Sequence, residues 1–487
     1  MSSRTDEPEG PFAVAVAMVL AIAALLRLPG LDAQLWYDEI ATLVISVRQP
    51  LATILTDFPG VNQHPLYSVL SHASIGAFGE SPWALRLPAV VFGVVAVWTV
   101  WDAGRLLLSR TEALAAAVLV ATSSHHVWFS QNARGYTMLA TFTLLSTALL
   151  LRLAERHDRR IEAAYVACAV AGVYTHLTMA FVLVAHVLTV AGAWVFGARE
   201  ARRYAPSRLA VMWAVTIGLI AVTYAPYVPA LLATFAEKAP PQAAKVATAG
   251  RAAGDLVRGV TEGFGVLGLL VAVVSAVAGG LALLRSRPFV VWLLVMPAVT
   301  TVGLTALMGQ PIRPRFVFNL SGAAAIFVAF GASLLARGIA GRLGGRAPAA
   351  YGAALVALLL TLAPGAAAAL ARNATVPKQD FEAPLAMLDA ASANGRTVVG
   401  AGAICLPLQR YFERPWPCAE TDEAWQREVA GARDVLAVHT LIEFWHDPAL
   451  VERMTRDCRD VRRFPGTLGG GDVVVCEPRS PRASAPR

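Results

Sequence analysis

Long apolar runs fill most of the sequence, and short polar connections separate them. Pro11–Leu28, Pro82–Leu108 and Phe316–Ala336 are examples of these runs. About 20 apolar residues in a helix cross the roughly 30 Å hydrocarbon core of a bilayer, so each run predicts a membrane-spanning helix. The pattern predicts about eleven spans, near residues 11–28, 82–105, 111–128, 134–152, 162–176, 178–197, 208–232, 263–284, 288–308, 316–336 and 348–371. The first run is treated as a retained helix because no small-residue cleavage site follows it.

Arginine clusters occupy alternate connections between these spans. Because positive residues stay on the cytoplasmic side, the clusters predict a cytoplasmic N-terminal tail (1–10) and an outward-facing first loop (29–81). The connection around 233–262 and the C-terminus then also face outward. Merging the fifth and sixth spans into one kinked unit would reverse every later connection and place the arginine clusters there outside, so an odd span count is favoured. The clusters are Arg105 and Arg110; Arg152, Arg156, Arg159 and Arg160; Arg199, Arg202, Arg203 and Arg208; Arg285 and Arg287; Arg337, Arg342 and Arg346.

The pattern changes after about residue 372, where the transmembrane domain (11–372) ends. Short strand candidates, Thr397–Ala403, Asp434–His439 and Asp472–Glu477, alternate with amphipathic helix candidates over 381–393, 421–432 and 447–460. This predicts a small extracytoplasmic α/β domain over 373–478, followed by a disordered tail (479–487). The placement of this domain motivates the hypothesis that it helps to select an acceptor.

Four of the five cysteines fall in this C-terminal region: Cys405, Cys418, Cys458 and Cys476. Outside the cytoplasm they can form disulfides. The sequence-local pairs Cys405–Cys418 and Cys458–Cys476 are the first choice among three connectivities, and free buried thiols are the alternative.

Composition supports the membrane assignment and argues against nucleic acid as a partner. The chain of 487 residues is 56% hydrophobic and 15% charged, whereas soluble proteins carry about 25% charged residues. The net charge of +8 would suggest nucleic acid in a soluble protein, but here topology accounts for it. Membrane lipids, and not nucleic acid, are the expected surroundings. We therefore predict a multi-pass protein of the plasma (inner) membrane and cell envelope.

The first outer loop brings two acids close to the membrane surface. Asp38 and Glu39 follow Trp36 and Tyr37, a few residues beyond the first span. A carboxylate there can act as a general base toward a hydroxyl or amine, or can coordinate a divalent ion, while the aromatics anchor the segment at headgroup depth. The structural alternative is an ordinary acidic pair at the start of an interfacial helix.

Other polar groups stand at the predicted outer ends of spans. Guanidinium groups there can bind a lipid-linked phosphate through paired hydrogen bonds, although arginines at helix ends also commonly extend to lipid headgroups. A single histidine before proline is weak evidence, because it often serves as a cap. The groups are His64, which opens a short helix over Pro65–Phe78, then Gln131, Arg134 and Tyr136, His176, and Arg313 and Arg315.

Several function classes lack their motifs. The sequence contains no Walker motif, no GxGxxG fingerprint and no His-Glu-x-x-His helix, so nucleotide-binding and zinc-hydrolase functions have no support. No compact set of intramembrane carboxylates indicates a proton-coupled transporter either.

Ordered motifs over residues 10 to 336 resemble one known family. They are Trp36-Tyr-Asp38-Glu39, His64-Pro-Leu-Tyr67, Ala84-Leu-Arg86-Leu-Pro88, Gln131-Asn-Ala-Arg134-Gly-Tyr136, Tyr174-Thr-His176 and Pro311-Ile-Arg-Pro-Arg315-Phe. In this order and sidedness the sequence resembles the family 39-like members of the GT-C glycosyltransferase superfamily, which include protein O-mannosyltransferases and aminoarabinose transferases. The fold that this implies is an all-α polytopic membrane bundle of GT-C type, with amphipathic helices in the first outer loop and a small C-terminal α/β domain.

The resemblance implies transfer of a sugar from a polyprenyl-phosphate carrier to a lipid, glycan or protein acceptor on the outer face, with inversion. Asp38 would be the base or its orienting carboxylate, with Glu39 beside it. Arg134 and Arg315, with Arg313 nearby, would steady the phosphate. His64, Gln131, Tyr136 and His176 would shape the substrate pocket, and Arg86 would be structural.

Two positions depart from the family pattern: Leu66 replaces a usual proline and Leu177 a frequent aromatic. A divalent cation could bind Asp38 and Glu39, but two adjacent acids do not determine a metal requirement, so the cofactor is left open. The main alternative function is a transporter or flippase that moves a lipid-linked sugar without breaking its glycosidic bond. A binding or scaffold protein is the third alternative.

Overall fold

The computed structural model describes residues 9–60, 63–237, 242–308, 313–342, 348–432 and 434–478. The chain divides into two compact units, which are described separately. The first comprises Met1–Pro29, Pro50–Gly79 and Arg86–Leu370, and the second Gly30–Gln49, Glu80–Leu85 and Ala371–Arg487. The sequence placed the whole first loop in the transmembrane domain, whereas residues 30–49 group with the C-terminal part of the chain. Most of the expected N-terminal tail and the whole expected C-terminal tail lie outside the described residues.

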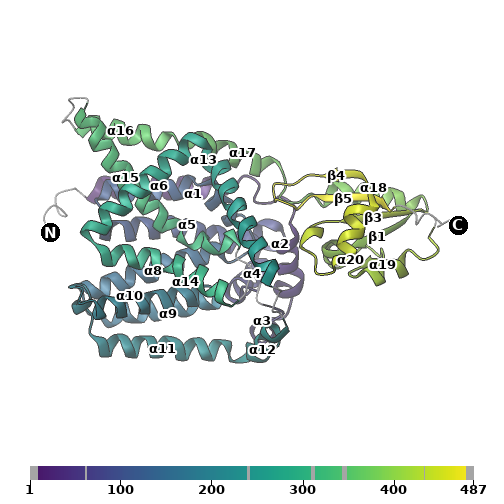
Figure 1. Ribbon diagram of the computed structural model, residues 1–487, viewed down its shortest axis with the longest axis horizontal. Coiled ribbons are helices and arrows are strands. Elements are labelled where there is room, and N and C mark those ends of the chain that lie inside the picture. Colours follow the sequence, from purple (N-terminus) through teal and green to yellow (C-terminus); the bar gives the residue numbers. More distant parts are fainter. Residues whose placement is uncertain are drawn as a thin grey trace. The chain divides into compact units, whose positions relative to one another are not determined.

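The first unit is built from helices, several of which pack side by side (Figure 1). Contacting pairs include α8 with α9, α10 with α14, and α13 with α15. The α-helices are α1 (Glu9–Leu25), α3 (Leu51–Thr56), α4 (Pro65–Phe78), α5 (Pro82–Leu107), α6 (Arg110–Thr122), α7 (Ser124–Ser130), α8 (Tyr136–Glu155), α9 (Arg159–Thr175), α10 (Met179–Val195), α11 (Pro206–Tyr224), α12 (Val228–Glu237), α13 (Gln242–Ser286), α14 (Pro288–Leu307), α15 (Ser321–Arg342), α16 (Pro348–Leu360) and α17 (Ala363–Thr375). Short 3-10 segments are η2 (Ala201–Arg203), η3 (Ala225–Tyr227) and η4 (Pro314–Leu320).

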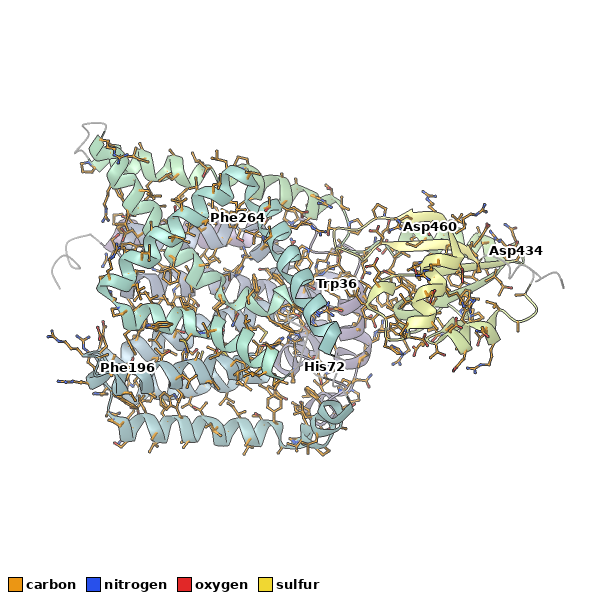
Figure 2. All side chains as sticks on the ribbon, in the orientation of Figure 1. Trp36, His72, Phe196, Phe264, Asp434 and Asp460 are labelled. Atoms are coloured by element: carbon orange, nitrogen blue, oxygen red, sulfur yellow. A yellow bond between two sulfur atoms is a disulfide. The ribbon has the colours of Figure 1, made fainter. Side chains whose placement is uncertain are left out.

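Helices stand at every predicted span, and the fifth and sixth spans are separate helices, α9 and α10. By length and composition, seven helical segments of the described chain can cross a membrane, or eight if the pair α6 and α7, bent by 59°, is one span. Apolar side chains that point outward fit this setting: Phe196, at the end of α10, is 89% exposed (Figure 2). The chain is therefore an integral membrane protein, and the count of about eleven spans remains a prediction.

Glycine allows α13 and α15 to approach each other closely. A Cβ atom on Gly331 of α15 would lie 1.7 Å from the backbone oxygen of Ser275 in α13, so any larger residue there would push the helices apart. Gly265, with φ +68°, interrupts α13. Helices α12 and the first part of α13 occupy most of the predicted connection around 233–262. Alanine-rich sequence with good helix propensity accounts for this helical structure.

Two carboxylates bind arginines from three of the clusters at the helix ends predicted to be cytoplasmic. Asp102 of α5 accepts from Arg105 at 3.0 Å and from Arg152 of α8 at 2.6 Å. Glu112 of α6 accepts from Arg337 of α15 at 2.7 Å. Because both carboxylates are almost fully buried, these pairs satisfy charges that would otherwise be costly to bury.

The second unit contains a five-stranded mixed sheet in the order β2-β1-β3-β5-β4. β1 runs parallel to β2 and β3, and β5 runs antiparallel to β3 and β4. The strands are β1 (Thr397–Ala401), β2 (Cys418–Ala419), β3 (Val435–His439), β4 (Cys458–Phe464) and β5 (Val473–Pro478). The helical segments are α2 (Tyr37–Ala41), η1 (Thr42–Val47), α18 (Glu382–Ala393), η5 (Gly402–Ile404), η6 (Pro407–Tyr411), α19 (Asp422–Glu428), η7 (Ile442–Phe444), α20 (Pro448–Glu452) and η8 (Arg453–Asp457).

Three of these strands, β1, β3 and β5, were predicted from the sequence, and two were not. β4 begins at Cys458, inside the predicted helix 447–460, and its five central residues are exposed. A charged edge strand has no apolar alternation to reveal it, and such charge protects a sheet edge from pairing with other chains.

One predicted disulfide is present: Cys458 in β4 is bonded to Cys476 in β5. The expected Cys405–Cys418 bond is not formed, and both residues are thiols in the structure. A hydrogen bond to Cys418, together with burial, raises the pKa of the Cys405 thiol and keeps it protonated.

Candidate active site

In the first unit, four separated segments bring polar side chains together. His64 precedes α4, Arg134 and Tyr136 stand at the start of α8, His176 follows α9, and Arg315 lies in η4. We call these five residues the histidine cluster. The His64 ring lies 4.8 Å from His176 and 5.2 Å from Tyr136, centroid to centroid. Phe316 of η4 meets His176 at 6.2 Å. The sequence predicted each of these positions separately, and the structure gathers them.

Gly135 makes this approach possible. A Cβ atom there would lie 2.6 Å from Thr175 and 2.9 Å from the Nδ1 atom of His64, so a larger side chain would force the segments apart. The Gly135 amide donates to that Nδ1 atom at 3.2 Å. The glycine thus connects the start of α8 to the loop before α4.

Both histidines of the cluster are neutral. Burial and the nearby charges of Arg134, His176 and Arg315 hold the pKa of His64 well below its ordinary value. Burial, Arg134 and Arg315 lower the pKa of His176 to about 3. A neutral imidazole carries one ring proton. Each ring accepts a backbone N–H at Nδ1, His64 from Gly135 and His176 from Thr178 at 3.1 Å, so its proton sits on Nε2.

The cluster therefore offers donors to a negatively charged group. Nε2 of His64 and the hydroxyl of Tyr136 are buried and have no hydrogen-bond partner among the described residues. Buried polar atoms without partners are rare in folded proteins, and each requires an explanation such as a catalytic role or a bound ion or water. Two guanidinium groups raise the local positive potential. The arrangement is suited to an anion such as a phosphate.

Asn319, also in η4, is a residue that the sequence reasoning missed. Its side chain is 2% exposed, and neither amide atom has a hydrogen-bond partner among the described residues. It sits within Phe-Val-Phe-Asn-Leu-Ser. This apolar surrounding at the start of a span hid the amide, although a polar residue inside a span is itself a signal.

Gln131 makes structural contacts. Its amide donates to the backbone oxygens of Arg27 at 3.0 Å and Pro29 at 2.6 Å. Arg27 is fully buried and donates to Ser130 and to His126. These contacts connect the end of α1 to the α7–α8 connection that carries Arg134.

Two further arginines were named from the sequence: Arg313 precedes η4, and Arg86 is buried in α5. The predicted roles of these residues stay predictions.

Asp38 and Glu39 belong to the second unit, at the start of α2. We call Trp36–Glu39 the acidic segment. Glu39 is fully buried and accepts from the backbone amide of Trp36, the N-cap of α2, at 3.3 Å. Its other oxygen lies 3.6 Å from the Nζ atom of Lys378. Asp38 is 9% exposed, and its backbone oxygen accepts from Thr42 at 2.8 Å.

The described residues form no group of three or more His, Cys, Asp or Glu side chains able to hold a metal ion. Asp38 and Glu39 supply two carboxylates, and Glu39 is already engaged by Lys378 and the Trp36 amide. Divalent cations in proteins usually take more oxygen ligands than this. We derive no metal-dependent step from these residues.

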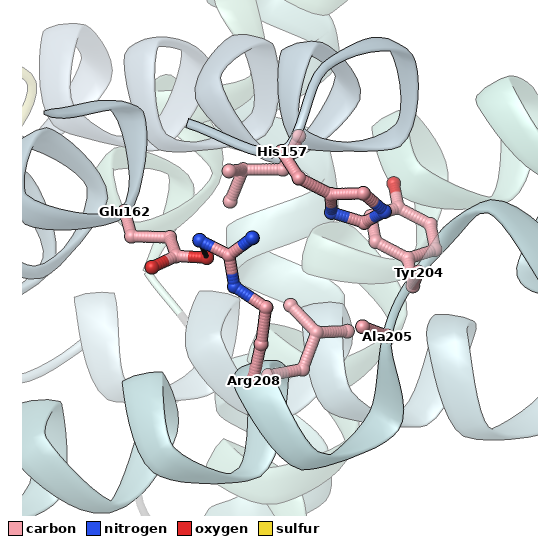
Figure 3. A pocket seen from close by; sticks show the side chains of 7 residues that line it. His157, Glu162, Tyr204, Ala205 and Arg208 are labelled. Carbon is pink, nitrogen blue, oxygen red and sulfur yellow. Dashed lines mark ion pairs between the residues drawn. The ribbon is translucent and has the colours of Figure 1, made fainter. Parts of the chain in front are cut away.

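A small cavity in the first unit is lined by none of the histidine cluster residues (Figure 3). It is lined by Leu153, His157, Glu162, Tyr204, Ala205, Arg208 and Leu209, and its enclosed space is about 10 Å³, roughly the size of one water molecule. This is below the roughly 300–1,000 Å³ of ligand pockets. Arg208 and Glu162 pair within it at 2.8 Å, so its charges are already satisfied.

Comparisons with known proteins agree with the family suggested by the motifs. Residues 62–227 match the family model described as dolichyl-phosphate-mannose-protein mannosyltransferase. ArnT from Cupriavidus metallidurans in the apo state has a similar structure, with a TM-score of 0.55 at 13% identity, over 96% of this chain and 98% of that one. The family match over residues 62–227 and the shared fold support membership of the GT-C superfamily of membrane glycosyltransferases. The predicted fold class and the enzyme class, glycosyltransferase, are confirmed at this level.

Two further GT-C structures were determined with lipid phosphates. ArnT from Cupriavidus metallidurans bound to undecaprenyl phosphate matches with a TM-score of 0.52 and 13% identity, over 99% of this chain and 100% of that one. The oligosaccharyltransferase AglB from Archaeoglobus fulgidus, in complex with an inhibitory peptide and a dolichol-phosphate, matches with a TM-score of 0.58 and 14% identity. The match covers 97% of this chain and 75% of that one. No curated protein sequence shows a significant match.

Proposed function

We propose that this GT-C protein transfers a sugar from a polyprenyl-phosphate donor to an acceptor on the outer face of the membrane, with inversion at the anomeric carbon. The observation that carries the proposal is the histidine cluster: two arginines near two neutral imidazoles whose ring protons sit on Nε2. These groups fit a phosphate that gains charge as it leaves.

The reaction needs a base and a stabilised leaving group. In the proposed step, Asp38 accepts the proton of an acceptor hydroxyl or amine, and the acceptor atom attacks the anomeric carbon. The bond between that carbon and the phosphate oxygen breaks, and its electrons stay on the carrier phosphate. Arg134 and Arg315 stabilise this anion, and the Nε2 protons of His64 and His176 can donate hydrogen bonds to it.

The relatives support the donor class. The structures of ArnT with undecaprenyl phosphate and AglB with a dolichol-phosphate show that this fold can hold a polyprenyl carrier. A lipid, glycan or protein is the proposed acceptor. We place the acidic segment, the histidine cluster and the C-terminal domain on the extracytoplasmic side, because the arginine clusters predict that topology.

A flippase would use the same cations without breaking the glycosidic bond. The two functions differ in their products. Purified protein in nanodiscs, given a polyprenyl-phosphosugar labelled in the sugar and supplied with envelope extracts as acceptor, should release unglycosylated carrier phosphate and label the acceptor. Intact donor recovered after many turnover times, with movement across vesicle membranes, would support the flippase instead.

A further inference from the structure

The segment between α17 and α18 is fixed to the end of the sheet in the second unit. The backbone oxygens of Pro377 and Lys378 accept from Thr467 at 2.9 Å and Leu468 at 3.0 Å. These two donors lie in the connection between β4 and β5. A Cβ atom on Gly466 would lie 2.2 Å from the Lys378 oxygen, so the connection and the segment are in close backbone contact.

Gln379 extends this connection through its side chain. It is fully buried, and its Nε2 donates to the hydroxyl of Thr440 at 2.9 Å and to the backbone oxygen of Gly471 at 3.1 Å. Thr440 directly follows β3, and its hydroxyl also donates to Gly471 at 3.1 Å. Both amide protons of Gln379 are therefore used within the α/β domain, which fixes the direction of its oxygen.

That oxygen accepts the Tyr37 amide of the acidic segment at 2.8 Å. The neighbouring Lys378 places its Nζ atom 3.6 Å from Glu39, and its side chain is only 12% exposed. A third contact lies just upstream: Gln34 accepts from the Phe381 amide at 2.8 Å and donates to Asp380 at 3.0 Å. Three consecutive polar residues, Lys378, Gln379 and Asp380, thus hold the chain on either side of Trp36.

Each contact satisfies a group that would be costly to leave buried alone. The Tyr37 amide is at the first turn of α2 and lacks a partner within the helix. Glu39 is a fully buried carboxylate, and its charge requires a cation or several donors. Removing either partner should allow the acidic segment to shift while the sheet itself stays folded.

We propose that Lys378 and Gln379 are positioning residues that hold the acidic segment, and with it Asp38, for sugar transfer. This inference rests on the proposed function. It gives the α/β domain a role in the chemical step, beyond the selection of an acceptor. Because a displacement of about 1 Å at a reacting group can cost about 100-fold in rate, the loss should fall on kcat and leave the KM for the donor unchanged.

The test compares Lys378→Met, Lys378→Arg and Gln379→Met with a matched control, Arg396→Met. Arg396 pairs with Asp434 at 2.7 Å and Glu477 at 3.0 Å in the same domain, and none of these residues belongs to the acidic segment. Two quantities are measured on the full-length protein in nanodiscs: kcat and KM for the polyprenyl-phosphosugar, and hydrogen exchange in peptides covering 34–47 and β1 to β3.

Lys378→Met and Gln379→Met should each lower kcat by about 10- to 100-fold with the donor KM within about twofold. Exchange in 34–47 should rise while β1 and β3 stay protected. Lys378→Arg keeps the cation and should recover most of kcat, and Arg396→Met should behave like wild type. Normal kcat and normal exchange at 34–47 in both variants would overturn the inference, as would a loss of kcat matched by Arg396→Met.

The readouts separate this inference from the proposed function. If the wild-type protein does not transfer the labelled sugar, the proposed function fails whatever the variants do. The exchange data still decide whether Lys378 and Gln379 hold the acidic segment. If the wild-type protein transfers sugar and the variants match it in both readouts, the positioning role alone fails.

Discussion

The histidine cluster of the first unit and the acidic segment of the second are both buried and polar, yet their polar atoms are satisfied differently. In the acidic segment, the Trp36 and Tyr37 amides and the Glu39 carboxylate all have partners. In the histidine cluster, Nε2 of His64 and the Tyr136 hydroxyl have none among the described residues. The difference indicates two tasks. The acidic segment holds Asp38 in a fixed position, and the histidine cluster has hydrogen-bond donors that a bound anion would satisfy.

The largest effect should come from the arginines of the cluster. Arg134→Met and Arg315→Met each remove a charge-assisted interaction of about 3 kcal/mol, so kcat/KM for the donor should fall by at least about 100-fold. Arg105→Met is the control, because its partner Asp102 keeps Arg152. Equal losses in all three variants would contradict the assignment of the cluster as the phosphate site.

The disulfide tests the second unit without touching the cluster. Cys458 and Cys476 are 18 residues apart, and closing a loop of that size stabilises a fold by about 3 kcal/mol. Cys458→Ala with Cys476→Ala should lower the free energy of unfolding of the α/β domain by about that amount. Donor affinity, measured by titration with polyprenyl phosphate, should not change. A matching loss of affinity would mean that the two regions do not act separately.

The pH dependence of stability should report the neutral histidines. The folded-state pKa of His176 is about 3, below its ordinary 6.5, so the unfolded chain binds more protons between these values. Stability should therefore fall as pH drops below about 6.5, by up to about 1.4 kcal/mol per pH unit for this imidazole. Unfolding of His176→Gln across pH 4 to 7 should show a shallower slope. A wild-type slope in His176→Gln would contradict the prediction.

Tyr136→Phe should give the smallest effect. It should weaken donor affinity without lowering thermal stability. Its hydroxyl is buried without a protein partner, so its removal should leave thermal stability unchanged or slightly higher. If the hydroxyl meets the donor, affinity should weaken by about 1 kcal/mol, or roughly fivefold. A less stable variant with normal donor affinity would show that the hydroxyl is structural.

Much of the fold could be predicted from the sequence, because apolar runs and helix start signals are local. Pro65 after His64 correctly predicted α4, and the runs correctly placed helices at each span. Pairing across long distances is not local. Nothing near Asp38 in the sequence indicates that Lys378 and Gln379 hold the acidic segment, since more than 300 residues separate them. The exposed, charged β4 and the amide of Asn319 were missed because their neighbours gave no periodic signal.

The candidate site also has features that the sequence predicted and features that it could not. Residue types and their order predicted His64, Arg134, Tyr136, His176 and Arg315, and the structure gathers them. The sequence could not predict that both imidazoles are neutral with the proton on Nε2. That depends on burial and on the backbone amides of Gly135 and Thr178.

The most direct test of the account is single-turnover transfer by Asp38→Asn in nanodiscs, with donor binding measured on the same sample. The substitution removes the proposed base and leaves every residue of the histidine cluster in place. We predict polyprenyl-phosphosugar binding within about twofold of wild type and a transfer rate reduced by at least about 100-fold. Near-normal transfer by Asp38→Asn would contradict the account.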